Sequence, residues 1–216
     1  MARAGQIMIV GNGPVDEGAA PLIDAADLVI RFNGSRNFGE AGRKTDIIAV
    51  CNTGRPGATM LADPAWRDSE AVSRTAEIWS VRDPDKFAEL KPQLAITHPE
   101  LDDFCDDYTD GFEAFATAKG KQHRIINRDI HEALDAALVA LDAEPYVVPS
   151  SGMVVIQALL SDPDHAEDTI ILAGFGHSGW DGHPFDAERR LVDRYITSDR
   201  IMRLQPLFAS SLAQGT

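Results

Sequence analysis

The sequence predicts an α/β protein whose mostly parallel sheet is covered by helices on both faces. Short runs rich in Ile and Val alternate along the chain with segments of helical period. Continuous apolar runs of this kind are typical of strands that are buried on both faces, as in parallel sheets. Several of these runs end directly in glycine or asparagine, as expected for a Rossmann-like fold with its ligand site at the carboxyl edge of the sheet.

The pattern predicts eight strands, at residues 6–10, 28–32, 46–51, 76–81, 93–97, 123–126, 169–173 and 201–204. Between several of them, helices are expected at residues 99–118, 128–141, 152–160 and 185–195. Residues 54–82 are rich in Gly, Pro, Asp and Arg without clean periodicity, and we expect there a long loop with a short helix. The helix at 128–141 is strongly amphipathic, and His131 is expected on its surface.

Composition limits the classes of partner. The 216 residues include 20 basic and 34 acidic side chains, a net charge of −14 that disfavours binding to nucleic acid or to anionic membranes. No apolar signal segment or membrane span is seen, so we expect a bacterial-type cytoplasmic protein. A boundary could lie at residues 119–121, but the strand-end motifs occur on both sides of it. We therefore expect one domain over residues 1–216.

Three strands are predicted to end at an asparagine. The first runs into Gly11-Asn12-Gly13, the second ends at Asn33 and the third at Asn52. An amide offers donors and an acceptor without charge, which suits a ribose hydroxyl or a base edge. The dinucleotide fingerprint G-x-G-x-x-G fails, because Asp16 replaces its third glycine and Asn33 replaces the acidic residue of the second strand. A nucleotide site is therefore favoured over a nicotinamide-dependent oxidoreductase.

A second candidate site lies at Pro149-Ser150-Ser151-Gly152, just before an apolar helical run. Serine is a good residue for capping the start of a helix, which alone would explain the motif. Free backbone amides at a helix start also attract phosphate or carboxylate groups. Both explanations stay open, and they are compatible.

The loop after the strand at 169–173 contains two histidines. His177, Asp181 and His183 could ligate a metal, but one short loop is a poor cage, and we expect no metal. A histidine can instead act as a general base at neutral pH. His183 precedes a predicted helix start at Pro184 and lies five residues before Glu188, so it is the better candidate for a base that faces the site.

Taken together, these motifs resemble the sialyltransferases of glycosyltransferase family 29. The long sialylmotif is similar to residues 11–13, 22–33 and 39–45. The short sialylmotif is similar to the stretch that runs from 149–152 to 174–176, and the very short motif to the pair His183 and Glu188. The bacterial sialyltransferases of family 42 share the Gly-Asn-Gly-Pro opening, the asparagines after the second and third strands, and the Ser-Gly before a helix. Residues 55–145 show no such resemblance.

The resemblance implies a compact bacterial member with a nucleotide-sugar fold of the glycosyltransferase variant-A type. It implies an inverting, metal-independent transferase without a cofactor, which moves sialic acid, Kdo or a similar acidic sugar from a CMP-activated donor to a hydroxyl group of a glycan or glycolipid acceptor. His183 would be the catalytic base, and Glu188 would support the donor site. The residues implied in donor binding are Gly11, Asn12, Gly13, Asn33, Asn52, Ser151, Gly152 and His177.

Two other functions stay open on the same residues. One is a non-catalytic nucleotide-binding accessory protein that keeps the fold and has lost transfer. The other, less favoured, is a metal-dependent hydrolase that uses the loop at residues 174–183.

Overall fold

The computed structural model describes residues 4–143 and 145–204, so residues 1–3, 144 and 205–216 of the expected domain lie outside the described part. Seven strands form one sheet in the order β5-β4-β3-β2-β1-β6-β7, and every neighbouring pair is parallel. The strands are β1 (Gln6–Val10), β2 (Leu28–Phe32), β3 (Ile47–Val50), β4 (Glu77–Ser80), β5 (Gln122–Ile125), β6 (Thr169–Ala173) and β7 (Ile201–Arg203). The predicted α/β class with a parallel sheet is confirmed.

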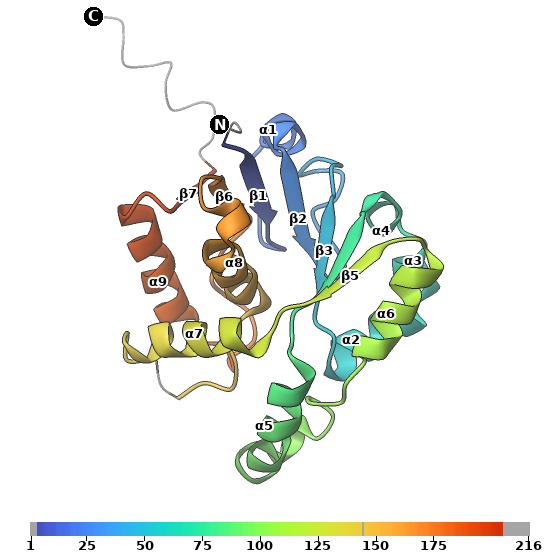
Figure 1. Ribbon diagram of the computed structural model, residues 1–216, viewed down its shortest axis with the longest axis vertical. Coiled ribbons are helices and arrows are strands. Elements are labelled where there is room, and N and C mark those ends of the chain that lie inside the picture. Colours follow the sequence, from blue (N-terminus) through green and yellow to red (C-terminus); the bar gives the residue numbers. More distant parts are fainter. Residues whose placement is uncertain (1–3, 144, 205–216) are drawn as a thin grey trace, which may run out of the picture.

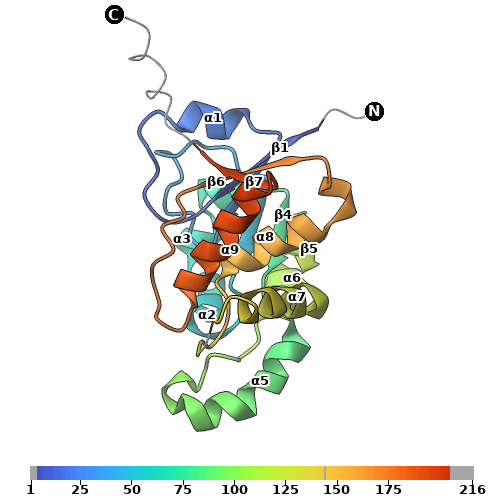
Figure 2. The same ribbon diagram turned by 90° about the vertical axis from the view of Figure 1, so that its left-hand side faces the viewer.

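Helices cover both faces of this sheet (Figures 1 and 2). One face carries α7 (Arg128–Val139), α8 (Ser151–Ser161) and α9 (Phe185–Thr197). The other face carries α1 (Ala20–Ala25), α2 (Gly54–Ala62), α3 (Pro64–Arg67), α4 (Glu70–Arg74) and α6 (Thr109–Ala118). The helix α5 (Pro84–Thr97) extends beyond the lower end of the sheet in Figure 1, and two 3-10 turns lie at Pro99–Leu101 and Pro163–His165. None of the helices among the described residues is long and apolar enough to cross a membrane.

The alternation of side chains along the strands builds two cores. In β1, Ile7 and Ile9 pack with α7, α8 and α9, whereas Met8 and Val10 pack on the opposite face with α1. Each of these four side chains is at most 2% exposed. A strand buried on both faces needs apolar residues at every position, which explains why the sequence shows continuous runs rather than a polar alternation.

Four local predictions were wrong. Residues 93–97 form the end of α5 rather than a strand, because the helix begins at the cap Asp83, whose side chain accepts a hydrogen bond from the backbone of Lys86, and continues through them. The stretch 54–74 holds three helices instead of a long loop with one short helix, while β4 lies on the strand predicted at 76–81. The helix expected at 99–118 is divided into a 3-10 turn and α6. His131 is buried, at 2% exposure, rather than on a helix surface.

The sheet order places β1 between β2 and β6. Strands β2 to β5 are added on one side of β1 and strands β6 and β7 on its other side, so the order of addition switches between β1 and β6. Open α/β sheets usually bind ligands in the crevice at such a switch point. Here the loops after β1 and β6 are joined by a backbone hydrogen bond, in which the Gly13 N–H donates to the Gly174 carbonyl at 3.0 Å. A Cβ atom on Gly11 would overlap that same carbonyl oxygen, and one on Gly13 would lie only 2.7 Å from it. The glycines of the first motif therefore serve the close approach of two loops.

Candidate functional site

A cavity of about 320 Å³ lies at the carboxyl ends of β2, β3 and β4, which we call the strand-end cavity. Each of the three strands contributes the residues that follow it. Residues 100–104 between α5 and α6, the first turn of α8 and the loop before α9 complete the wall. The side chains that matter for the chemistry are Asn33, Thr53, Arg82, Phe104, Ser151, Trp180 and His183. The structure thus brings together three of the predicted site residues, Asn33, Ser151 and His183.

Asn33 sits in the cavity wall in a left-handed backbone conformation, with a φ of 50°. Asparagine is among the few residues that adopt this conformation readily. Its Oδ1 accepts a hydrogen bond from the Cys51 N–H at 2.8 Å, and its carbonyl accepts one from the Trp66 indole at 2.9 Å. The amide nitrogen makes no hydrogen bond to a described residue, so it is the donor that Asn33 can offer to a ligand.

His183 has a defined tautomer. Its Nδ1 lies 2.8 Å from the Val148 carbonyl, which can only accept, so Nδ1 carries the proton and Nε2 is the acceptor. The ring is held edge-on by Trp180 and Phe185, at centroid distances of 5.0 and 5.4 Å. Burial lowers the pKa of His183 and the charge of Arg82 adds to this, while the Val148 carbonyl opposes it. His183 is therefore neutral at pH 7.

Arg82 is a cavity residue that the sequence reasoning missed. Its guanidinium lies over the rings of Phe104 and Phe87, at 4.3 and 4.9 Å from their centroids, and donates to the Thr53 hydroxyl. Burial lowers the pKa of Arg82, and no carboxylate of the described residues forms an ion pair with it. The same strand-end rule that selected the asparagines would have found it, because it follows the strand predicted at 76–81.

Two predicted site residues lie behind the cavity wall and are fully engaged inside the protein. Asn52 is 0% exposed. Its Nδ2 donates to the Arg82 carbonyl at 2.9 Å and to the Thr109 hydroxyl at 2.7 Å. Its Oδ1 accepts a hydrogen bond from the Arg82 N–H at 2.8 Å. Glu188 is 1% exposed and accepts from the Ser150 N–H at 2.6 Å and the Ser150 hydroxyl at 2.8 Å. Burial raises the pKa of Glu188. Both side chains hold strand and helix ends in place.

The remaining predicted residues have other contacts. Asn12 ties its loop to the end of β2, because its Nδ2 donates to the Phe32 carbonyl at 3.3 Å and its Oδ1 accepts from the Arg36 N–H at 3.0 Å. Gly152 is the second residue of α8, where a Cβ atom would lie 2.6 Å from the ring of Phe175. Together with Gly11 and Gly13, these residues shape the loops around the strand ends.

His177 lies apart from the strand-end cavity. Its Nε2 accepts a hydrogen bond from Arg203 at 3.3 Å, and burial with the charges of Arg203 and Arg189 lowers its pKa to about 4. The alternative metal site needed His177 to converge with Asp181 and His183, yet only His183 lines this cavity. Residues 4–143 and 145–204 contain no group of three His, Cys, Asp or Glu side chains placed to hold a metal ion.

Comparison with solved structures identifies sialyltransferases of the same fold. A mammalian sialyltransferase matches with a TM-score of 0.53 and 18% identity, over 93% of this chain and 69% of that one. The sialyltransferase CstII from Campylobacter jejuni matches at 0.52 and 11%, over 94% and 80%, and an alpha-2,3-sialyltransferase from the same organism at 0.51 and 15%, over 94% and 76%. At these identities the similarity shows a shared fold alone.

Comparison with characterised sequences gives a different functional class. No family model matches the chain. A protein of Rhizobium meliloti (strain 1021), the urease operon 23 kDa accessory protein, is 55% identical over 209 residues, which are 97% of each chain. This relationship overturns the prediction of a CMP-sugar glycosyltransferase, and it does not support a sugar donor and a glycan acceptor as partners.

The physical reason for the error lies in the contacts described above. The motif residues Gly11, Gly13, Asn52 and Glu188 pack loops and fix strand and helix ends, so the pattern reports the fold rather than transfer chemistry. The 55% sequence identity to the Rhizobium meliloti protein, over 97% of each chain, decides the family. This chain belongs to the family of the urease operon 23 kDa accessory protein.

Proposed function

We propose that this chain is a non-catalytic accessory protein of urease that binds a nucleotide in its strand-end cavity. The observation that carries the accessory role is the 55% identity over nearly the full length of the Rhizobium meliloti protein. As part of this proposal, the chain works in the cytoplasm as one domain without a metal cofactor, and its fold derives from the same ancestral fold as the family 29 sialyltransferases.

The cavity chemistry supports a nucleotide as the ligand. Arg82 supplies a positive charge without a carboxylate partner among the described residues, and the first turn of α8 adds N–H groups that have no intrahelical partner. Both favour a phosphate group. Asn33 offers an amide donor and His183 a neutral ring nitrogen, which suit ribose hydroxyls or a base edge.

A complementation experiment tests the accessory role. Deleting the gene of the 23 kDa protein in Rhizobium meliloti should lower urease activity relative to the amount of urease protein, and expression of this chain should restore it. A deletion strain with unchanged urease activity would refute the accessory role. As the matched variant, Ile96→Ser alters an exposed position on α5, at 79% exposure, and should restore activity as the unchanged chain does.

A binding experiment tests the nucleotide separately. CMP should raise the unfolding temperature of the purified protein in a concentration-dependent way, since a ligand that binds the native state stabilises it by mass action. Asn33→Ala should weaken CMP binding by about 1–3 kcal/mol, the usual consequence of removing a buried polar partner. Equal or tighter binding of AMP or NAD would contradict the preference for a pyrimidine nucleotide.

A further inference from the structure

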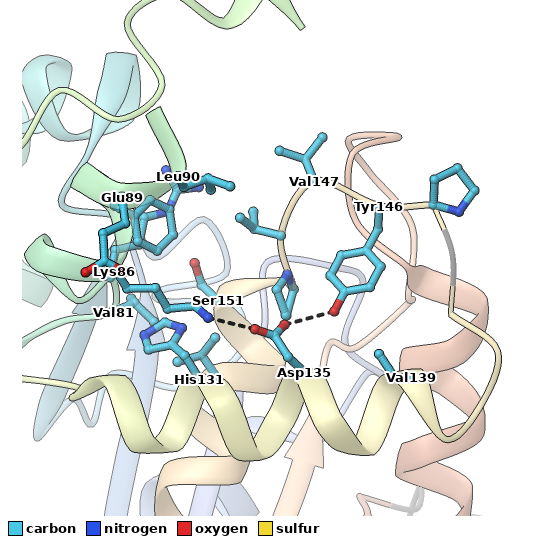
Figure 3. A pocket seen from close by; sticks show the side chains of 16 residues that line it. Val81, Lys86, Glu89, Leu90, His131, Asp135, Val139, Tyr146, Val147 and Ser151 are labelled. Atoms are coloured by element: carbon cyan, nitrogen blue, oxygen red, sulfur yellow. Dashed lines mark hydrogen bonds and ion pairs between the residues drawn. The ribbon is translucent and has the colours of Figure 1, made fainter. Parts of the chain in front are cut away.

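A second, larger cavity of about 600 Å³ lies between α5, α7 and the segment 146–149 (Figure 3). We call it the α5–α7 cavity. It meets the strand-end cavity at Arg82 and Ser151, which line both, but its other walls are different. Most of its lining lies in residues 81–146, outside the sequence motifs, and only its edge at Pro149 and Ser151 belongs to one of them.

One wall of the cavity carries an organised set of polar side chains. The Lys86 ammonium group lies 2.9 Å from Asp135 Oδ2, and the Tyr146 hydroxyl donates to Asp135 Oδ1 at 2.9 Å (Figure 3). Lys86 and Asp135 are only 27% and 29% exposed, so this ion pair is shielded from water. An ammonium group has three N–H donors, so Lys86 has donors to spare for an anionic group in the cavity.

His131, which lines the same cavity, holds a polar atom without a partner. The residue is 2% exposed, and its Nε2 makes no hydrogen bond to any of the residues that the structure describes. Burial lowers the pKa of His131, and the nearby Lys86 charge adds to this, so the ring is neutral and Nε2 can accept. Buried polar atoms are rarely left without a partner, because the lost hydration is not replaced. A hydroxyl group brought by a ligand would supply one.

The charge balance and the apolar walls define the rest of the ligand. Among the charged lining residues, Asp135 is offset by Lys86, and Glu89 pairs with Arg128 at 2.8 Å, whereas Arg82 has no acidic partner in the described part of the chain. The lining therefore holds two basic and two acidic side chains, and Arg82 is the one whose charge is not offset by a described carboxylate. Its other walls are apolar side chains, including Phe87, Leu90, Val148 and Val154.

We propose that the α5–α7 cavity binds a small organic anion with an apolar body and a hydroxyl group. Its anionic group pairs with Lys86, its body packs on Leu90 and Val154, and its hydroxyl donates to Nε2 of His131. This site shares Arg82 and Ser151 with the proposed nucleotide site, but the three residues assigned to the anion, Lys86, Leu90 and His131, line the α5–α7 cavity and not the strand-end cavity.

The probe for this site is 4-hydroxybenzoate, added to the full chain labelled with ¹⁵N at the imidazole rings. His131 and His183 report on the two cavities separately. Saturable binding in the millimolar range or tighter should shift the Nε2 resonance of His131 as it gains a hydrogen bond, and leave that of His183 in place. CMP should do the reverse, so failure of one site is distinguishable from failure of the other. Benzoate and phenol, which each lack one polar group, should bind about tenfold more weakly.

Two pairs of variants on α5 complete the test. Lys86→Met should weaken 4-hydroxybenzoate binding by about tenfold or more, whereas Lys91→Met, which removes an exposed lysine paired with Asp106, should not. Leu90→Trp fills the cavity and should abolish binding, with Ile96→Trp as its matched control. The proposal is overturned if His131 shows no saturable shift, if the shift appears at His183 instead, or if both lysine variants bind equally well.

Discussion

Replacing Asn52 with alanine should destabilise the protein in the absence of any ligand. The Asn52 amide is 0% exposed and makes three hydrogen bonds, two with the backbone of Arg82 and one with the Thr109 hydroxyl. A hydrogen bond contributes about 0.5–1.5 kcal/mol, and a buried group left without its partner costs about 1–3 kcal/mol. Because the Arg82 groups lose their partners inside the protein, we expect a loss of about 3–4 kcal/mol in the free energy of unfolding.

The assay is urea unfolding followed by circular dichroism. The midpoint urea concentration of the variant is compared with that of the unchanged protein, and the dependence of the free energy on urea concentration should stay the same. In a thermal scan the same loss corresponds to a fall of roughly 10 °C for a chain of this size. Asn12→Ala is the matched control, because Asn12 is less buried and its two hydrogen bonds are longer, at 3.0 and 3.3 Å, so about 1 kcal/mol is expected. If Asn52→Ala unfolds like the unchanged protein but no longer binds CMP, Asn52 is a ligand contact and our reasoning is wrong.

Three further outcomes are expected. Because burial raises the pKa of Glu188, its contribution to stability is full below the ordinary glutamate pKa and is lost as pH rises through the raised value. In urea unfolding followed upward from the ordinary glutamate pKa, Glu188→Gln should flatten this decline. Gly11→Ala should lower the free energy of unfolding by about 1–3 kcal/mol through overlap with a backbone carbonyl, whereas Gly34→Ala, with nothing within 4 Å of the added atom, should not. His183→Ala should weaken CMP binding in titration calorimetry, and His177→Ala should leave it unchanged, because only His183 lines the strand-end cavity. The opposite pattern would show that the nucleotide binds near His177 instead.

The inner strands β1 to β4 and β6 were predictable because burial on both faces leaves a strong signal, whereas the edge strand β5 is mostly exposed. All seven observed strands fall on predicted runs, and β1 shows why: its side chains at residues 7–10 are all buried, so every position is apolar. The segment 93–97 misled the prediction because Ile96 and Thr97 favour strands on average, while the helix start that decides their state lies at Asp83. Ile96 is 79% exposed, so its apolar side chain is not part of a buried strand.

The candidate site was only partly predictable. Asn33 follows β2, Ser151 begins α8 and His183 lies in the loop just before α9, and parallel topology brings such positions to one edge of the sheet. The sequence could not tell that Asn52 turns inward to hold the Arg82 backbone, because an asparagine at a strand end serves packing and binding equally well. The α5–α7 cavity stayed invisible for another reason: its residues come from segments whose mutual placement depends on the whole fold.

The position of β1 between β2 and β6 has a consequence for how the chain is made. β1 pairs with β2 close by in sequence, but its other edge pairs with β6, about 160 residues later, from Gln6 with Thr169 to Val10 with Ala173. During synthesis the first five strands emerge long before that partner, so an apolar strand edge stays open until the last part of the chain has left the ribosome. Open apolar edges of this kind promote association between chains, and long-range parallel pairing is slow. A nascent chain truncated before residue 169 should therefore aggregate, and full-length folding should benefit from chaperones that shield this edge.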